Sequence, residues 1–377
     1  MGAFFGLSRR GRWALPGAAL AITGGVIAAT LIPSAQASPS LPAKTPAQLL
    51  ASVAAQTHVP AFTGSVLETT SLGLPQLPGS NDQTSLIALL TGSHTVNVWF
   101  ANPQKYRLSL PGKMSESDLY RDGQIAWLWQ SVPDTAVKLL GSQDTSGQAP
   151  MPLPVTPQQA AADILAAVGP TTTVSVASNV YVAGQASYEL VLAPKDARSL
   201  IGEVRIAVDA ANGLPLRVEV VARHASSPAI TIGFTSITFG APSPGDLTFT
   251  PPKGAKVSTV DLSHGGGSGG PSDGADVIGS GWLSVLKLPA STLTDAAGAP
   301  SGNENPVNGG DDAAALQAVL GSATTVQGAF GSGQLIKTSL VNVLITGGSM
   351  YVGAVEPSVL EAAAAAAGGP GQSNTVH

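Results

Sequence analysis

Long stretches of the chain alternate apolar and polar residues with a period of two. The clearest case is 216–220, in which Leu216, Val218 and Val220 alternate with Arg217 and Glu219. This alternation is typical of a β-strand with one face toward the core and one toward water, and it favours antiparallel pairing. The pattern predicts about ten strands, at 62–70, 95–101, 105–110, 118–121, 125–130, 135–140, 181–192, 204–208, 216–220 and 229–239.

The segments between these strands contain the residues that tight turns require. Asp122-Gly123 and Asn212-Gly213 each lie between two predicted strands, and both dipeptides suit two-residue hairpin turns. Strands joined in meander order form a sheet that curves on itself. The fold class predicted is therefore α+β, built on a curved antiparallel sheet that forms an open, unclosed β-barrel.

Two short helices interrupt the strand pattern. The first begins at Thr45, where threonine can cap the helix, Pro46 suits the first turn and Gln48 completes a capping box. The same order returns at Thr156, and Gly169-Pro170 ends the second helix. Both helices have an apolar stripe and are expected to pack on the sheet.

A glycine- and serine-rich stretch at 264–274 divides the chain, because this composition cannot bury a core and behaves as a flexible linker. We expect the linker to be exposed and cleavable by proteases. It separates a domain at 38–263 from a small α+β domain at 275–377. The elements predicted in the second domain are strands at 277–288, 335–346 and 351–355, a helix from Asp311 to Gly321, and a terminal helix after Pro357.

The amino terminus has the features of a secretory signal peptide. Arg9, Arg10 and Arg12 precede an apolar stretch at 14–32, and the small residues at 35–37 match a cleavage site. The sequence predicts a signal peptide at 1–37, cleaved after Ala37, and an exported protein. The residues after the arginines favour the general secretory route over the twin-arginine route. The alternative is an uncleaved helix that anchors the protein in the membrane.

Composition narrows the range of functions. The chain has 377 residues, a formal net charge of −5 and 11% charged residues, and the basic side chains form no stripe that could bind nucleic acid. Cysteine is absent, which excludes disulfides, thiolate metal sites and a cysteine nucleophile. The 44 glycines and 29 prolines favour turns and short strands over long helices.

No catalytic or metal-binding constellation is apparent. The histidines lie on separate elements without metal-ligand spacing and are expected to be solvated. The adjacent acids Asp311 and Asp312 are best explained as a helix cap, and no G-x-S-x-G elbow occurs. We therefore predict no catalytic residues, no metal and no cofactor, and hence a protein that is not an enzyme.

Two apolar faces are candidates for binding a ligand. Alternation places Ile125, Trp127 and Trp129 on one face of a strand, and it places Val96, Val98 and Phe100 on one face of another. Two interpretations stay open, since such faces can be ordinary core or can line a pocket for an apolar ligand. We expect both tryptophans on the concave, helix-covered side of the sheet.

Several segments in this order resemble a known superfamily. They are the first helix, 102–107, 119–129, the strand, Asn-Gly turn and strand at 209–218, and 249–255. Together they cover about 45–257 and resemble the periplasmic lipoprotein-carrier superfamily of LolA and the amino-terminal domain of RseB. The resemblance implies an unclosed barrel with helices across its mouth, which holds acyl chains as a carrier or sensor. The segment 73–92 and the carboxy-terminal domain depart from it.

The leading hypothesis is an extracytoplasmic binding protein whose partner is a lipid or a lipoprotein acyl chain. The alternative is an envelope-stress or sigma-factor regulator of the RseB type, which binds a membrane protein of the cell envelope. A third possibility, a structural cell-wall protein, lacks the sequence repeats expected of wall binding. Nucleic acid is not expected as a partner.

Overall fold

The structure is a computed structural model, and it describes residues 38–54, 59–73, 92–112, 114–141, 156–166, 169–261, 275–292 and 320–368. The predicted signal peptide, the linker at 264–274 and the acidic pair Asp311 and Asp312 lie outside the described residues. The division into domains at that linker therefore stays a prediction.

Both amino-terminal helices are present, as α2 (Pro46–Ala54) and α4 (Pro157–Ala166). The predicted capping box of α2 is confirmed, because the Gln48 backbone N–H donates to Thr45 Oγ1 at 3.2 Å and the Thr45 N–H donates to Gln48 Oε1 at 2.8 Å. In α4, the Gln159 N–H donates to Thr156 Oγ1 at 3.3 Å. Local sequence thus determines where each helix begins.

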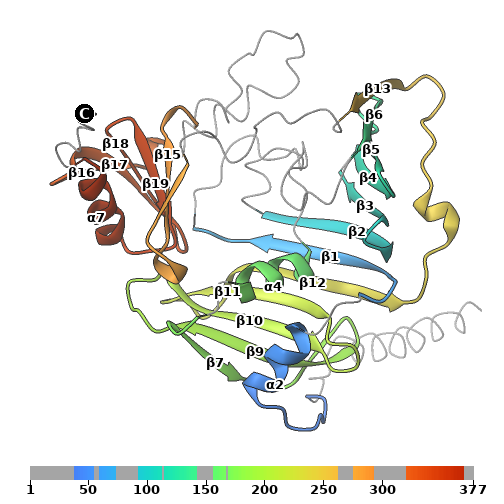
Figure 1. The fold of residues 1–377 in the computed structure, drawn as a ribbon, viewed down its shortest axis with the longest axis horizontal. Coiled ribbons are helices and arrows are strands. Elements are labelled where there is room, and N and C mark those ends of the chain that lie inside the picture. The colour runs from blue at the N-terminus through green and yellow to red at the C-terminus, as the bar shows by residue number, and fades with distance from the viewer. Residues whose placement is uncertain are drawn as a thin grey trace, which may run out of the picture. The chain divides into compact units, whose positions relative to one another are not determined.

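A large curved sheet contains 13 strands, in the order β13-β6-β5-β4-β3-β2-β1-β12-β11-β10-β9-β7, with β8 paired to β9 (Figure 1). The path has two ends, so the sheet is not closed. Its strands are β1 (Phe62–Thr70), β2 (Gly92–Asn102), β3 (Lys105–Pro111), β4 (Glu116–Asp122), β5 (Ile125–Gln130), β6 (Thr135–Leu140), β7 (Thr172–Val176), β8 (Val180–Val182), β9 (Gln185–Pro194), β10 (Ile201–Asp209), β11 (Pro215–Ala222), β12 (Pro228–Phe239) and β13 (Lys256–Asp261).

Most neighbours in the sheet are antiparallel, as predicted, but β13 pairs with β6 in parallel, so the sheet is mixed. After β12, the chain passes β3 and β4 through the short helix η1 (Pro244–Leu247) before it reaches β6 (Figure 1). This connecting segment, 240–255, is called the arm below. The arm brings β13 to the sheet in the same direction as β6, which local alternation could not predict.

The predicted strand at 181–192 is two strands, β8 and β9. The chain turns between them at Ala183 and Gly184, which have positive φ angles of 49° and 80°. The predicted Asp-Gly and Asn-Gly turns are confirmed, because Gly123 and Gly213 adopt φ angles of 62° and 77°. Glycine reaches this left-handed region without the steric penalty of a Cβ atom.

The main hydrophobic core lies on one face of the sheet, here called the inner face. Leu49 of α2 and Ala161 of α4 are fully buried there together with Ile206 of β10 and Val218 of β11. The helix α4 packs on β11 and β12, and α2 packs on β7. The helices therefore cover the β7–β12 part of the inner face.

A second, six-stranded sheet follows, in the order β14-β15-β19-β18-β17-β16, and α7 (Pro357–Gly368) packs on β18 and β19. The terminal helix and the Gly347-Gly348 turn are as predicted, whereas the expected strands 277–288 and 335–346 are each divided in two. The elements are β14 (Asp276–Ile278), η2 (Gly281–Leu283), β15 (Val285–Pro289), β16 (Thr324–Gly328), β17 (Gly331–Lys337), β18 (Asn342–Thr346) and β19 (Ser349–Gly353).

Candidate functional site

The structure separates the six predicted site residues onto opposite faces of the large sheet. Directly paired residues share a face, and the pairs Val98 with Leu108, Leu108 with Leu119, and Leu119 with Leu128 run across β2 to β5. Leu128 therefore lies on the inner face with Val98. Its neighbours Trp127 and Trp129 point to the opposite side, here called the outer face.

The expectation that the tryptophans face the helix-covered side is therefore wrong. Alternation shows which residues share a face, but it does not show toward which face the sheet curves. The smaller residues Ala126 and Leu128 are the buried ones, with 4% and 9% of their surface exposed, whereas both tryptophans are only half-buried. Ile125, at the start of the same strand, is 37% exposed.

The inner-face group is continuous with the main core. Val96 and Val98 are both buried, and Phe100 stacks on Phe62 with ring centroids 5.4 Å apart. Tyr106 continues this aromatic row, 6.5 Å from Phe100. Packing of this kind fits the interpretation as core, and it makes the inner face strongly apolar at β1 to β3.

A separate apolar cluster continues the inner face across β3 to β6. Its buried members are Leu119, Ala126, Leu128 and Leu139, and Val137 packs against them. The main contacts of α2 and α4 are with β7, β11 and β12, on the other half of the sheet. Apolar side chains therefore extend along the inner face well past the strands on which the described helices pack.

One pair of titratable residues lies within this apolar face. Glu68 of β1 is directly opposite His94 of β2, and Glu68 also pairs with Ile232 of β12. His94 is only 4% exposed, so the expectation that the histidines are solvated is wrong for this residue, although it holds for the exposed His224. Burial raises the pKa of Glu68, and the charge of His94 opposes that shift.

On the outer face, aromatic residues gather around Phe249 of the arm. Its ring lies 4.9 Å from Tyr120, 5.4 Å from Trp127 and 5.8 Å from Trp129, measured between ring centroids. Lys138 of β6 lies 5.5 Å from the Trp127 ring. The two tryptophans therefore form a platform on which the arm packs, and sequence alternation could not identify Phe249 as their partner.

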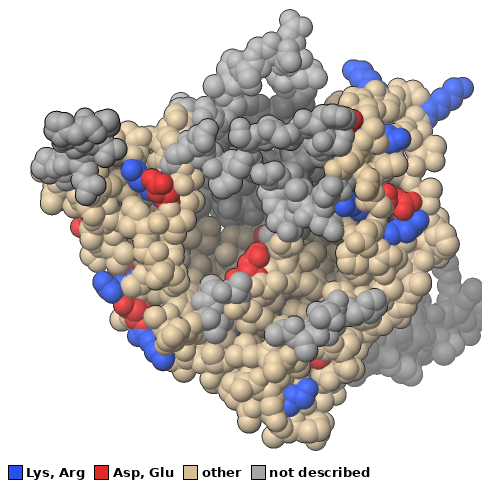
Figure 2. Space-filling model, in the orientation of Figure 1, with Lys and Arg blue, Asp and Glu red and all other residues tan. Residues whose placement is uncertain are grey.

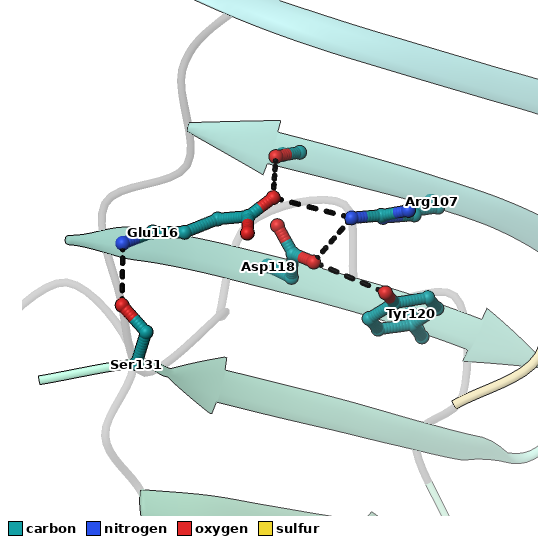
Figure 3. A network of polar contacts seen from close by, with 6 residues as sticks. Arg107, Glu116, Asp118, Tyr120 and Ser131 are labelled. Atoms are coloured by element: carbon teal, nitrogen blue, oxygen red, sulfur yellow. Dashed lines mark hydrogen bonds and ion pairs between the residues drawn. The ribbon is translucent and has the colours of Figure 1, made fainter. Parts of the chain in front are cut away.

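A charged network lies beside this platform (Figure 3). Arg107 Nη2 donates to Asp118 Oδ2 at 2.7 Å and to Glu116 Oε1 at 3.2 Å, and the Tyr120 hydroxyl donates to Asp118 Oδ2 at 3.1 Å. The Arg107 guanidinium also lies 4.5 Å from the Trp99 ring and 4.9 Å from the Tyr120 ring. The period-two spacing of Glu116, Asp118 and Tyr120 is the signal that could have identified this shared face from the sequence.

Burial dominates the acid–base properties of the network. Asp118 is 2% exposed, and burial raises its pKa, against hydrogen bonds and the charge of Arg107 that lower it. Burial and the neighbouring Asp118 charge likewise raise the pKa of Tyr120. A carboxylate bonded to both an arginine and a tyrosine is typical of a structural network that fixes side-chain geometry.

Comparisons with known proteins give no match to a family model and none to a curated protein. Among solved structures, a chain of the Pseudomonas aeruginosa MucA/MucB complex is 16% identical, covering 85% of this chain and 96% of that chain with a TM-score of 0.41. A LolA superfamily protein from Nitrosomonas europaea is 12% identical, covering 55% and 99%, with a TM-score of 0.24. Solved LolA-superfamily proteins are thus similar to this chain.

An uncharacterized conserved protein from Thermus thermophilus is also similar, at 10% identity and a TM-score of 0.32, and covers 57% of this chain and 98% of that chain.

The described residues show few other features of a metal-binding, charged or membrane-spanning site. They contain no group of three or more histidine, aspartate or glutamate side chains placed to hold a metal ion. On the face drawn in Figure 2, their charged side chains lie in small, separate groups. Within the same described segments, no helix is both long and apolar enough to cross a membrane.

The raised pKa of Asp118 makes stability depend on pH. Its pKa in the folded state lies above the unfolded value of 3.8, so its contribution to stability is greatest below pH 3.8 and is lost as pH rises through the folded pKa. Asparagine does not ionise, so Asp118→Asn does not lose stability in this way as pH rises. We therefore expect the unfolding free energy of Asp118→Asn to improve relative to wild type as pH rises from 3.8 toward neutral, measured by urea denaturation.

Asp196 provides a control of opposite sign. Hydrogen bonds from Arg198 lower its pKa to about 2, so its contribution is present above pH 3.8 and is lost as pH falls toward 2. The unfolding free energy of Asp196→Asn should therefore improve relative to that of wild type as pH falls. Equal pH profiles for the two variants would contradict the assignment of Asp118 as a buried, destabilised carboxylate.

Proposed function

We propose that the protein is an extracytoplasmic binding protein that holds an apolar ligand, the acyl chain of a lipid or lipoprotein, against the inner face of the large sheet. The observation that carries this proposal is the row of apolar residues that continues across β2 to β6, beyond the strands on which α2 and α4 pack. The row consists of Val98, Leu108, Leu119, Leu128 and Val137.

The physical basis is the burial of methylene groups. Each methylene transferred from water to an apolar surface contributes about 0.8 kcal/mol, so a chain of a dozen carbons in contact with this row gains enough to offset the cost of ordering it. In the proposed arrangement the two helices lie across the mouth of the open barrel and close over the ligand. The sequence resemblance to lipoprotein carriers supports the same role.

The proposed location follows from the amino terminus. A basic start, an apolar stretch and a small-residue cleavage box support export through a signal peptide cleaved after Ala37, with an uncleaved anchor as the alternative. In both cases the sheet acts outside the cytoplasm, where an acyl chain in transit needs protection from water.

A second candidate function is regulation by binding a membrane protein of the cell envelope. The observation that favours it is β13, an edge strand in which every residue is exposed, including Val257 at 54% and Val260 at 43%. An exposed edge can pair with a strand from a partner. A membrane protein that the exported protein retains in a pull-down, and that β13 deletion releases, would favour this function over carriage.

Adjacent residues of β6 provide a matched test of the binding face. Val137 is on the inner face, whereas Lys138 pairs with Trp127 on the outer face, and both are half-buried. Val137→Gln places an amide against the acyl chain, which costs about 1–3 kcal/mol, so we expect affinity for a fluorescent acyl probe to fall about tenfold. Lys138→Gln is expected to bind as wild type does.

Lipid extraction of the purified protein, followed by mass spectrometry, supplies the independent readout. The proposal expects a co-purified acyl lipid that is depleted in Val137→Gln and retained in Lys138→Gln. An empty protein that takes up no acyl probe, or equal loss of binding in the two variants, would contradict it.

A further inference from the structure

We propose that one rim of the large sheet docks on a lipid bilayer whose surface carries anionic headgroups. The rim carries Met114 in the turn between β3 and β4, Val132 in the turn between β5 and β6, and Lys253 and Lys256 where the arm enters β13. It is called the docking rim below. Docking on a bilayer goes beyond binding a single acyl chain, and the two activities can be measured separately.

Backbone hydrogen bonds hold the segments of the docking rim side by side. The Ser131 N–H donates to the Glu116 carbonyl at 2.9 Å, which joins the β5–β6 turn to the start of β4. The Lys256 N–H donates to the Asp134 carbonyl at 2.9 Å, which joins the same turn to the start of β13. Three segments that are far apart in the sequence therefore form one continuous end of the sheet.

The apolar side chains of the docking rim are exposed to water. Met114 is 92% exposed, the highest value among the large apolar side chains that the structure describes, and Val132 is 63% exposed. A single exposed apolar residue is common on protein surfaces, but here two lie in neighbouring turns at the same end of the sheet. Both side chains would lose their contact with water if these turns entered hydrocarbon.

Two cations accompany the apolar turns. Lys253 and Lys256 are both exposed, and of the acids nearby Asp134 is exposed whereas Glu116 is bonded to Arg107. Lysine beside exposed apolar side chains is typical of a surface that lies at a membrane interface, because its ammonium group can reach the headgroups. Apolar turns flanked by cations thus match the layers of a bilayer, in which anionic phosphates lie above hydrocarbon.

The docking rim adjoins the apolar row of the inner face. Val137 lies two residues after the start of β6, and Leu119 lies three residues after the start of β4. At about 3.3 Å per residue, both lie about 7–10 Å from the rim. A bilayer at this rim would place hydrocarbon close to the row, so that an acyl chain could pass between membrane and protein without crossing open water.

Vesicle sedimentation measures docking, with phosphatidylcholine vesicles that contain or lack phosphatidylglycerol. We expect wild type to bind the anionic vesicles, and Met114→Gln with Val132→Ser to bind them about tenfold more weakly, because the turns lose the apolar surface they would bury. Lys253→Gln with Lys256→Gln should also bind them about tenfold more weakly, with little change on neutral vesicles. Val277→Ser is the matched control, since Val277 is 68% exposed on β14 of the second sheet, and it should bind as wild type does.

A fluorescent label gives the position of contact. The chain contains no cysteine, so Met114→Cys can carry a single dye whose emission shifts to the blue in hydrocarbon. We expect this shift when anionic vesicles are added, and none for the same dye on Val277→Cys. A shift that grows with protein concentration in the absence of vesicles would indicate contact with a second copy of the chain and overturn the inference.

The remaining outcomes separate docking from ligand binding. The inference is overturned if wild type sediments with neither kind of vesicle, or if Met114→Gln with Val132→Ser binds as wild type does. A protein that takes up an acyl probe but does not bind vesicles would refute docking and leave the proposed function standing. Vesicle binding that depends on Met114 and Val132, without uptake of an acyl probe, would support docking and contradict the proposed function.

Discussion

Arg107→Ala is expected to lower the free energy of unfolding by about 3–5 kcal/mol, the typical effect of removing one partner from a buried ion pair. Asp118 is 2% exposed and Arg107 is 19% exposed, so the variant leaves a largely buried carboxylate without its cationic partner. The variant also loses the contacts of the guanidinium with the Trp99 and Tyr120 rings. Urea denaturation followed by tryptophan fluorescence measures this loss.

A surface pair of the same residue types is the control. Arg198 and Asp196 are 59% and 35% exposed and bond at 2.7 Å, so Arg198→Ala should shift the denaturation midpoint very little. The double variant Arg107→Met with Asp118→Leu should recover much of the lost stability, because it removes both buried charges together. Similar destabilisation by Arg107→Ala and Arg198→Ala would show that burial of Asp118 does not determine the effect.

Phe249→Ala is expected to produce the second large effect, a decrease of about 2–3 kcal/mol in the free energy of unfolding. The Phe249 ring contacts Tyr120, Trp127 and Trp129, and each aromatic pair contributes about 0.5–1.5 kcal/mol beyond the area it buries. Because the ring is half-buried, the expected loss lies below that of a fully buried phenylalanine. Thermal unfolding gives the change in stability.

The loss should be local to the arm. Limited proteolysis of Phe249→Ala should cut within 240–255 faster than in wild type, because the arm no longer packs on the outer face. Val257→Ala, in the strand that the arm leads to, removes a side chain that is 54% exposed and should change neither readout. A Phe249→Ala protein with wild-type stability and an intact arm would mean that these ring contacts contribute nothing.

Features fixed by a few neighbouring residues could be predicted from the sequence. The capping box of Thr45 and Gln48 and the turns at Gly123 and Gly213 form because each depends on its own backbone and on one or two side chains nearby. The alternation of 216–220 predicted β11 for the same reason. Most strands of the large sheet were identified in this way.

Features that depend on distant segments could not be predicted. The side of the sheet toward which Trp127 points depends on the curvature of all the strands, and its partner Phe249 lies far along the chain. The parallel pairing of β13 depends on the path of the arm, and the short β7 carries too few alternating residues to be recognised. The burial of His94 likewise could not be read from its own strand, since its neighbours Ser93 and Thr95 are exposed and its partner Glu68 lies on another strand.

The central claim is that an acyl chain lies on the inner face, and photo-crosslinking tests it most directly. The protein is loaded with an acyl ester that carries a diazirine near the end of its chain, irradiated and digested, and the modified residues are identified by mass spectrometry. The account predicts modification at inner-face residues such as Leu108, Leu128 and Val137. Modification of Trp127 and Trp129 on the outer face, or none above the level of a denatured control, would contradict it.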